Sequence, residues 1–294
     1  GLLRTGTPDT YTFMDQAFNN EIDYLVEATS QCYENMLFRD GIHRSWFDMT
    51  IVRDTYRDWS VKCGIPMHQG IILRFIECLA ITMSPIIPHW SDMIWTVLTE
   101  CNAANAGEKR CSSVVHARWP AYVPFDRSIR KQFTFFRDFL RNSRLTIMKT
   151  KSFKAGQKTS AYILLASSYE AKKILVLNFL TNIYVANDNA FPTNLIPQLK
   201  EFVDGNEAFS GAEKKVMMQF GAFMRDETKE RGIDALATEL TFDQKMILEE
   251  NAAFIKLSLD LANVTFLGEG ESAPDDKKKK DVPVPGKPVL QFYF

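Results

Sequence analysis

The chain has 294 residues, of which 46% are apolar, enough to fill one large hydrophobic core or two smaller ones. The formal net charge at pH 7 is only −1, so overall charge does not indicate a polyanionic partner and only its distribution along the chain can. No apolar run approaches the ~20 residues that a membrane-spanning helix needs, and we expect no signal peptide and no membrane partner. The five cysteines show no C-x-x-C spacing, which predicts reduced thiols in the cytosol, without a disulfide framework or a zinc site.

Apolar residues at helical spacing dominate the first half of the chain. They predict one helix over residues 11–28 and a longer helical stretch over 32–59. Gly41 lies inside that stretch and marks a kink or a break, because glycine weakens a helix interior. Another helix is predicted over 127–148.

A proline-rich corner at residues 84–90 separates two further amphipathic helices. The first, over 68–83, ends there because proline has no N–H to donate and disfavours the helical conformation of the residue before it. The second restarts near Pro88. We expect Phe75 and Trp90 to be buried on either side of the corner. The apolar face of the second helix is predicted to consist of Trp90, Met93, Ile94 and Leu98.

The second half of the chain mixes strands with helices. Short apolar runs rich in β-branched and aromatic residues predict strands at 160–166, 264–267 and 289–294. Helices are predicted at 170–184 and near 197–202. Capping boxes, in which a hydroxyl and a carboxylate or amide three residues later satisfy two backbone N–H groups, predict two more helix starts. The two pairs are Ser210 with Glu213 and Thr241 with Gln244.

These elements predict a mainly α chain in two domains. A helical bundle occupies residues 1–150, and a small α+β domain occupies residues 151–294. Residues 272–287, rich in Asp, Lys and Pro, predict a flexible surface loop between the last two strands. No internal repeat is found.

The clearest candidate for a binding site is a run of cations between residues 127 and 158, among which Asp138 is the only acid. At about 100° per residue, four arginines project from one side of the predicted helix, and an apolar stripe lies about a quarter-turn away. A row of fixed cations suits a phosphate backbone, because each neutralised phosphate releases condensed counterions. The cations are Arg127, Arg130, Lys131, Arg137, Arg141, Arg144, Lys149, Lys151, Lys154 and Lys158. The four arginines of the row are Arg130, Arg137, Arg141 and Arg144, and the stripe consists of Ile129, Phe133, Phe136, Leu140 and Ile147.

Alternatively, this run of cations forms a solvent-exposed face whose positive charge is balanced by acids elsewhere in the chain. Other charged stretches indicate no binding site. Arg53, Asp54, Arg57 and Asp58 mix signs on one helix, which predicts ion pairs among themselves. The lysines at 277–280 are flanked by aspartates and predict a solubilising loop.

No catalytic motif is present. The four histidines are scattered and lack metal-ligand spacing, and neither a G-x-S-x-G elbow nor a G-x-G-x-x-G loop occurs. Residues 156–159 end like a phosphate-binding loop, but Gln157 separates the glycine from the lysine and the upstream glycine is absent. We therefore predict no catalytic residue and no metal ligand in this chain.

A series of short motifs, each occurring once, extends along nearly the whole chain. In the first half they are Leu3-Arg4-Thr5-Gly6, Tyr33-Glu34-Asn35-Met36, Arg53-Asp54-Thr55-Tyr56-Arg57, Arg74-Phe75-Ile76-Glu77, the proline-rich corner and Trp119-Pro120. In the second half they are Thr241-Phe242-Asp243-Gln244-Lys245, Glu249-Glu250-Asn251 and Gly286-Lys287-Pro288. The chain resembles the C-terminal region of the leucyl-tRNA synthetases of the cytosolic, archaeal and eukaryotic type.

The resemblance implies an anticodon-binding-type helical bundle followed by a C-terminal tRNA-binding α+β domain. It implies a cytoplasmic ligase that charges leucine tRNA with leucine, using ATP and Mg²⁺. The family's His-Ile-Gly-His and Lys-Met-Ser-Lys-Ser signatures and its inserted editing domain are not in this sequence. Because the chain begins with Gly1 and ends on an apolar run at Phe294, we expect a piece of a longer polypeptide whose catalytic and editing domains lie upstream.

The family's bundle braces the tRNA body, and its C-terminal domain reaches the long variable arm or the elbow of the tRNA. Leucine tRNA is therefore the expected partner. Two alternatives remain open. One is a free-standing tRNA- or RNA-binding module of the same ancestry. The other is a protein–protein adaptor that docks in a multi-synthetase assembly, which an exposed apolar patch on the second domain would favour.

Overall fold

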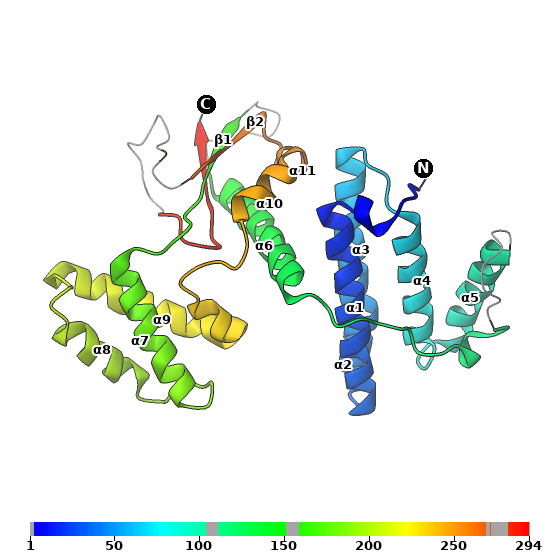
Figure 1. The fold of residues 1–294 in the computed structure, drawn as a ribbon, viewed down its shortest axis with the longest axis horizontal. Coiled ribbons are helices and arrows are strands. Elements are labelled where there is room, and N and C mark those ends of the chain that lie inside the picture. Colours follow the sequence, from blue (N-terminus) through cyan, green and yellow to red (C-terminus); the bar gives the residue numbers. More distant parts are fainter. Residues whose placement is uncertain (1–2, 104–110, 151–158, 269–270, 272–281, 294) are drawn as a thin grey trace. The chain divides into compact units, whose positions relative to one another are not determined.

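The computed structural model describes residues 3–103, 111–150, 159–268, 271 and 282–293 (Figure 1). It is mainly helical with one small sheet, so the predicted fold class is confirmed. The chain forms two units, Gly1–Leu140 with Glu250–Asp260, and Arg141–Glu249 with Leu261–Phe294. The predicted domains meet near residue 150, whereas this division falls at Leu140 and also returns a short helix to the first unit. No helix in the described ranges has the length and apolar character that crossing a membrane requires.

The first unit is a bundle of helices, several of which pack against its first long helix. Its elements are α1 (Phe13–Glu34), α2 (Phe38–Ile42), a π-helical segment (His43–Asp48), α3 (Met49–Cys63), α4 (Gln69–Met83), α5 (Pro88–Ala103), most of α6 (Arg127–Lys149) and α11 (Ala252–Ser258). α1 begins with a capping box in which the Thr12 hydroxyl accepts from the Asp15 N–H and the Asp15 carboxylate accepts from the Thr12 N–H. The buried Cys78 packs as a small hydrophobic residue in α4, as expected, and burial raises the pKa of its thiol to about 12.

The predicted helical stretch is interrupted on either side of Gly41, whereas the glycine itself lies within α2. The helical stretch breaks after Glu34, resumes as α2 and passes into the π-helical segment just after Gly41. A Cβ atom on Gly41 would lie 2.2 Å from Cε1 of Tyr33, so α2 can approach the end of α1 only with glycine here.

The corner between α4 and α5 differs from the prediction in one respect. Phe75 is buried as expected, but Trp90 is only partly buried and packs edge-to-face against Trp46 at 5.2 Å. The inward face of α5 instead carries Trp95, whose indole N–H donates to the carbonyl of Cys111 at 2.8 Å. Five residues turn a helix by 500°, so Trp90 points about 140° away from Trp95. Of the predicted face, Leu98 is buried, but Met93 is exposed and Trp90 only partly buried, so the predicted register of α5 was wrong by part of a turn.

The second unit contains the sheet, whose strand order is β2-β1-β3. β1 (Ser160–Leu164) lies in the middle, parallel to β2 (Asn263–Leu267) and antiparallel to β3 (Val289–Tyr293). All three predicted strands are thus confirmed. Ala161 and Ile163 are fully buried on one face of the sheet, as the alternation along a strand requires.

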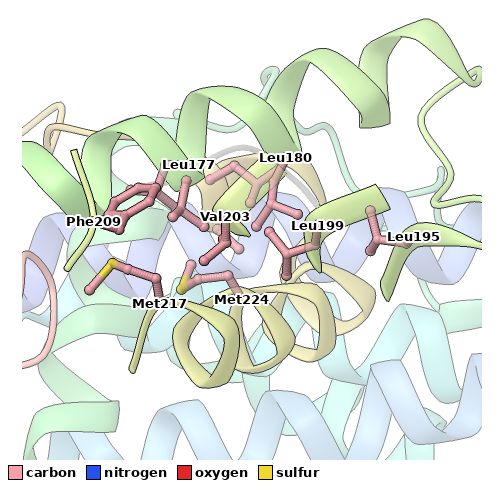
Figure 2. Close-up of a cluster of buried hydrophobic side chains, with 11 residues drawn as sticks. Leu177, Leu180, Leu195, Leu199, Val203, Phe209, Met217 and Met224 are labelled. Carbon is pink, nitrogen blue, oxygen red and sulfur yellow. The ribbon is translucent and has the colours of Figure 1, made fainter. Parts of the chain in front are cut away.

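Three helices of the second unit share a hydrophobic core, which Figure 2 shows. They are α7 (Ala171–Ala186), α8 (Leu195–Gly205) and α9 (Gly211–Arg231), and α10 (Gln244–Glu250) follows them. The side chains of this core include Leu177, Leu180, Leu199, Val203, Met217 and Met224.

One of the two predicted capping boxes is present. Ser210 and Glu213 cap α9 as expected. The predicted pair of Thr241 and Gln244 was wrong, because Asp243 caps α10 instead. Its carboxylate accepts from the N–H groups of the second and third helix residues, Lys245 and Met246, at 2.9 and 3.1 Å. Gln244 is buried and donates to the carbonyl of Ala166 at 2.6 Å, a tertiary contact that takes its side chain away from the helix start.

Candidate nucleic-acid interface

The start of α6 is fixed against α1 by a reciprocal pair of hydrogen bonds. Asn20 of α1 donates to the Asp126 carbonyl at 3.0 Å, and the Asp126 N–H donates to the Asn20 side chain at 2.7 Å. The Asp126 carboxylate then caps α6 by accepting from the N–H of Ser128 at 2.7 Å. These contacts set which side of α6 faces the bundle.

The apolar side of α6 packs into the first unit. Phe133, Phe136 and Leu140 of the predicted stripe are buried, while Ile129 and Ile147 are half-buried. Phe136 contacts Phe13 of α1 edge-to-face at 6.2 Å and lies 6.0 Å from Phe254 of α11. Phe135 and Phe139 are also buried, so the docking side is wider than the predicted stripe.

The side of α6 next to the docking side carries exposed cations. Arg137, Arg141 and Arg144 are exposed and lie within a narrow arc of the helix surface, as the predicted spacing requires. Within the described ranges, neither Arg141 nor Arg144 forms an ion pair or a side-chain hydrogen bond. Arg127 and Lys149, at the two ends of the helix, are exposed as well.

Arg130 differs from the other arginines of the row. Its Nε donates to Oε1 of Glu21 in α1 at 3.1 Å, and its guanidinium carbon lies 3.4 Å above the centre of the Tyr24 ring. Glu21 is buried, and this burial raises the pKa of its carboxyl, although Arg130 and Arg137 act in the opposite direction. The run of cations is therefore opposed by one acid that lies 109 residues earlier in the chain, in addition to Asp138.

The remaining cations of the run divide into two sets. Lys131 is half-buried and already has an interaction partner within the chain. Lys151, Lys154 and Lys158 lie outside the described residues.

The second group of cations pairs internally, as predicted. Arg53 and Arg57 both lie within ion-pair distance of Asp54, at 2.8 and 3.3 Å. Asp58 pairs with Lys62 at 2.9 Å instead. These charges are balanced on their own helix, unlike those of Arg141 and Arg144.

A buried acid in α1 could be mistaken for a reactive group. Asp15 is fully buried, and burial alone would raise the pKa of its carboxyl, but hydrogen bonds from Arg4, Tyr56 and Thr12 outweigh this effect and hold the pKa below its usual range. Every acceptor position that faces these neighbours is in use, so the carboxylate holds the start of α1 in place. Over the described ranges, no three His, Cys, Asp or Glu side chains gather in a way that could hold a metal ion.

Residues 15–163 match the family described as the anticodon-binding domain of tRNA ligase. The chain belongs to this family. The match begins in α1, includes the whole cationic side of α6 and ends in β1. The predicted family resemblance is therefore confirmed.

Similar proteins extend the likeness beyond the anticodon-binding domain. The cytoplasmic leucine–tRNA ligase of Dictyostelium discoideum is 29% identical over 298 residues, covering 99% of this chain and 26% of the relative. That of Pongo abelii is 27% identical over 309 residues, covering 99% of this chain and 24% of the relative. A putative cytoplasmic leucine–tRNA ligase of Schizosaccharomyces pombe is 34% identical over 93 residues, which are 32% of this chain and 8% of the relative. The chain thus spans about a quarter of the length of the first two relatives.

Proposed function

We propose that this chain is the tRNA-binding portion of a cytoplasmic leucine–tRNA ligase, and that the exposed side of α6 contacts the phosphate backbone of leucine tRNA. The anticodon-binding domain supports tRNA as the ligand, and the relatives' names support leucine as the amino acid. The observation that carries the proposal is the pair Arg141 and Arg144, exposed and without ion-pair partners in the described ranges, on a helix whose other side is buried.

Phosphate recognition follows from the geometry of the helix. With a rise of about 1.5 Å per residue, Arg137 and Arg144 are separated by roughly 10 Å along the axis of α6. The buried aromatic side chains hold this axis in place, so the backbone positions of the cations are fixed before the ligand binds and only their side chains have to be ordered. Phosphate contacts position an RNA without reading its sequence, and discrimination between tRNAs must come from other contacts.

The proposed phosphate-contacting set is smaller than the run of cations in the sequence. It consists of Arg127, Arg137, Arg141, Arg144 and Lys149. Lys151, Lys154 and Lys158 belong to it on sequence grounds alone. Arg130 and Lys131 are left out, because each already has a partner in the chain.

The chemistry of leucine activation is proposed for the longer protein, not for these residues. ATP and Mg²⁺ would bind to the family's signature motifs, which this sequence does not contain. The purified chain should accordingly show no leucine-dependent pyrophosphate exchange above a buffer control.

The adaptor alternative requires an exposed apolar anchor on the second unit. Among the described residues, the exposed aromatic ring of Phe223 in α9 has the Lys287 ammonium 4.4 Å above it, and Lys287 also pairs with Glu227 at 2.9 Å. A ring that a cation of the same unit covers is a weak anchor for a partner protein.

The proposal is tested by titrating the 294-residue chain with leucine tRNA, with the same tRNA lacking its long variable arm, and with a single-stranded RNA of equal length and random sequence. We expect the intact leucine tRNA to bind most tightly and the truncated form less tightly. Equal affinity for leucine tRNA and for the random RNA would refute the proposed function. Equal affinity for the two tRNAs would instead place the contacts on the tRNA body alone.

A further inference from the structure

The guanidinium group of Arg130 is held in place by contacts within the first unit. Tyr24 supports one face of its plane at 3.4 Å, and Glu21 accepts a hydrogen bond from Nε at 3.1 Å. Phe125 lies 5.8 Å from the guanidinium carbon and 5.1 Å from the Tyr24 ring, which it meets edge-on. A free arginine side chain has many rotamers, so these contacts remove most of its conformational freedom before any ligand binds.

No hydrogen bond, ion pair or ring contact in the described part of the chain occupies the other face of the guanidinium plane. The three separations of 3.4, 5.1 and 5.8 Å form a nearly right-angled triangle with its corner at Tyr24, so Phe125 lies beside the Tyr24 ring and does not cover Arg130. The side chain of Arg130 remains 36% exposed. Among the described residues, the hydrogen bond to Glu21 is the only one that its guanidinium group makes.

We propose that this unoccupied face of Arg130 stacks on an unpaired base of the bound tRNA, whereas Arg137, Arg141 and Arg144 contact phosphates. This inference rests on the proposed function. Arginine planes are a common stacking surface for unstacked RNA bases, and a preorganised plane loses little entropy when the base arrives. The plane lies on the same side of α6 as the phosphate-contacting arginines, roughly 10 Å along the axis from Arg137.

Charge argues against a phosphate at Arg130. Its cation already faces the Glu21 carboxylate and the electron-rich face of Tyr24. A phosphate there would have to compete with a buried acid that belongs to the fold, and few counterions would be released in exchange. Stacking makes no such demand, because it uses the plane and leaves the ion pair in place.

Two substitutions separate the plane from the charge. Arg130→Lys keeps a positive charge near Glu21 but has no plane, whereas Arg130→Gln keeps a planar end group but has no charge. For stacking, we expect Arg130→Lys to weaken the binding of leucine tRNA to the 294-residue chain by roughly tenfold, at the low end of the losses typical of a lost base stack. We expect Arg130→Gln to lose less than Arg130→Lys. The matched control is Arg57→Lys, an exposed arginine of α3 outside the proposed binding set that pairs with Asp54 at 3.3 Å, and this variant should bind like the unmodified chain.

The stacked base is found by replacing each unpaired nucleotide of leucine tRNA in turn with an abasic nucleotide, which keeps its phosphate. One position should lose affinity by a factor similar to that of Arg130→Lys, and combining both changes should cost no more than either alone. The loss should also persist at high salt, because stacking releases no counterions.

Several outcomes would overturn the inference. They are a larger loss for Arg130→Gln than for Arg130→Lys, a loss that disappears at high salt, and additive effects of Arg130→Lys with every abasic position. If neither variant folds, as judged by circular dichroism, the abasic series on the unmodified chain is the deciding test. Stacking is refuted if the affinity loss at every abasic position disappears at high salt. Failure of the unmodified chain to prefer leucine tRNA over random RNA would refute the proposed function itself, and with it this inference.

Discussion

The double substitution of Arg137 and Arg141 by glutamine tests the phosphate-contacting side of α6 most directly. Both side chains are exposed, so neutralising them should leave the core intact. Each lost phosphate contact reduces the slope of log affinity against log salt by roughly 0.7 to 0.9, so the two together should reduce it by about 1.4 to 1.8. Between 50 and 200 mM salt, the affinity of the unmodified chain should therefore fall roughly 7- to 12-fold more than that of the variant.

The measurement is a series of tRNA titrations at several salt concentrations, with leucine tRNA and at least one other tRNA. A matched control is the pair Arg53→Gln and Arg57→Gln, which changes the charge equally but removes cations that Asp54 already balances. We expect the control to leave the slope unchanged. An unchanged slope and affinity in the α6 variant would mean that its cations form an ordinary solvated face. A loss confined to leucine tRNA would mean that these arginines discriminate between tRNAs, contrary to the role proposed for them.

Three further predictions concern the bundle itself. Gly41→Ala should destabilise the chain in urea unfolding by about 1–3 kcal/mol, because its Cβ would overlap the Tyr33 ring, and a gain in stability from better helix propensity would contradict this. Trp95→Ala should cost about 3–5 kcal/mol, and Trp90→Ala clearly less because Trp90 is only partly buried, so equal losses would refute the register of α5 described above. Burial holds the pKa of Glu21 above its usual range, so the folded chain binds that proton more tightly than the unfolded chain does. Relative to Glu21→Gln, the stability of the unmodified chain should fall as pH rises from the ordinary glutamate pKa through this raised value, and a flat difference would show that the carboxyl is not perturbed.

Local patterns in the sequence were sufficient to predict most elements. Amphipathic spacing identified the helices of the bundle, and short runs of β-branched and aromatic residues identified all three strands. Each of these signals is contained in a short stretch of sequence and needs no distant residue. The same is true of α6, whose buried and exposed sides follow from its own periodicity. The division of the chain was harder to foresee, since α11 joins the first unit only through contacts with residues far away in sequence.

The errors have a common physical origin. Trp95 faces inward, where its indole N–H donates to the carbonyl of Cys111. The Gln244 side chain donates to the carbonyl of Ala166, 78 residues away. The pairing of Arg130 with Glu21 spans 109 residues. Each is a tertiary contact that overrides a local preference, and a single sequence contains no signal for it.

The division of the α6 cations between fold and ligand follows from what α1 places opposite them. Glu21 and Tyr24 are three residues apart and share one face of α1, so a single turn of that helix supplies both the acid and the ring that hold Arg130. Arg137 lies two turns farther along α6 and feels Glu21 only through its charge. Neither Arg141 nor Arg144 forms an ion pair with any described residue. The described part of α6 can therefore provide at most five phosphate contacts, which limits its contribution to the salt slope to roughly 3.5 to 4.5. A steeper measured dependence would require cations from elsewhere in the chain, and Lys151, Lys154 and Lys158 would be the first to substitute.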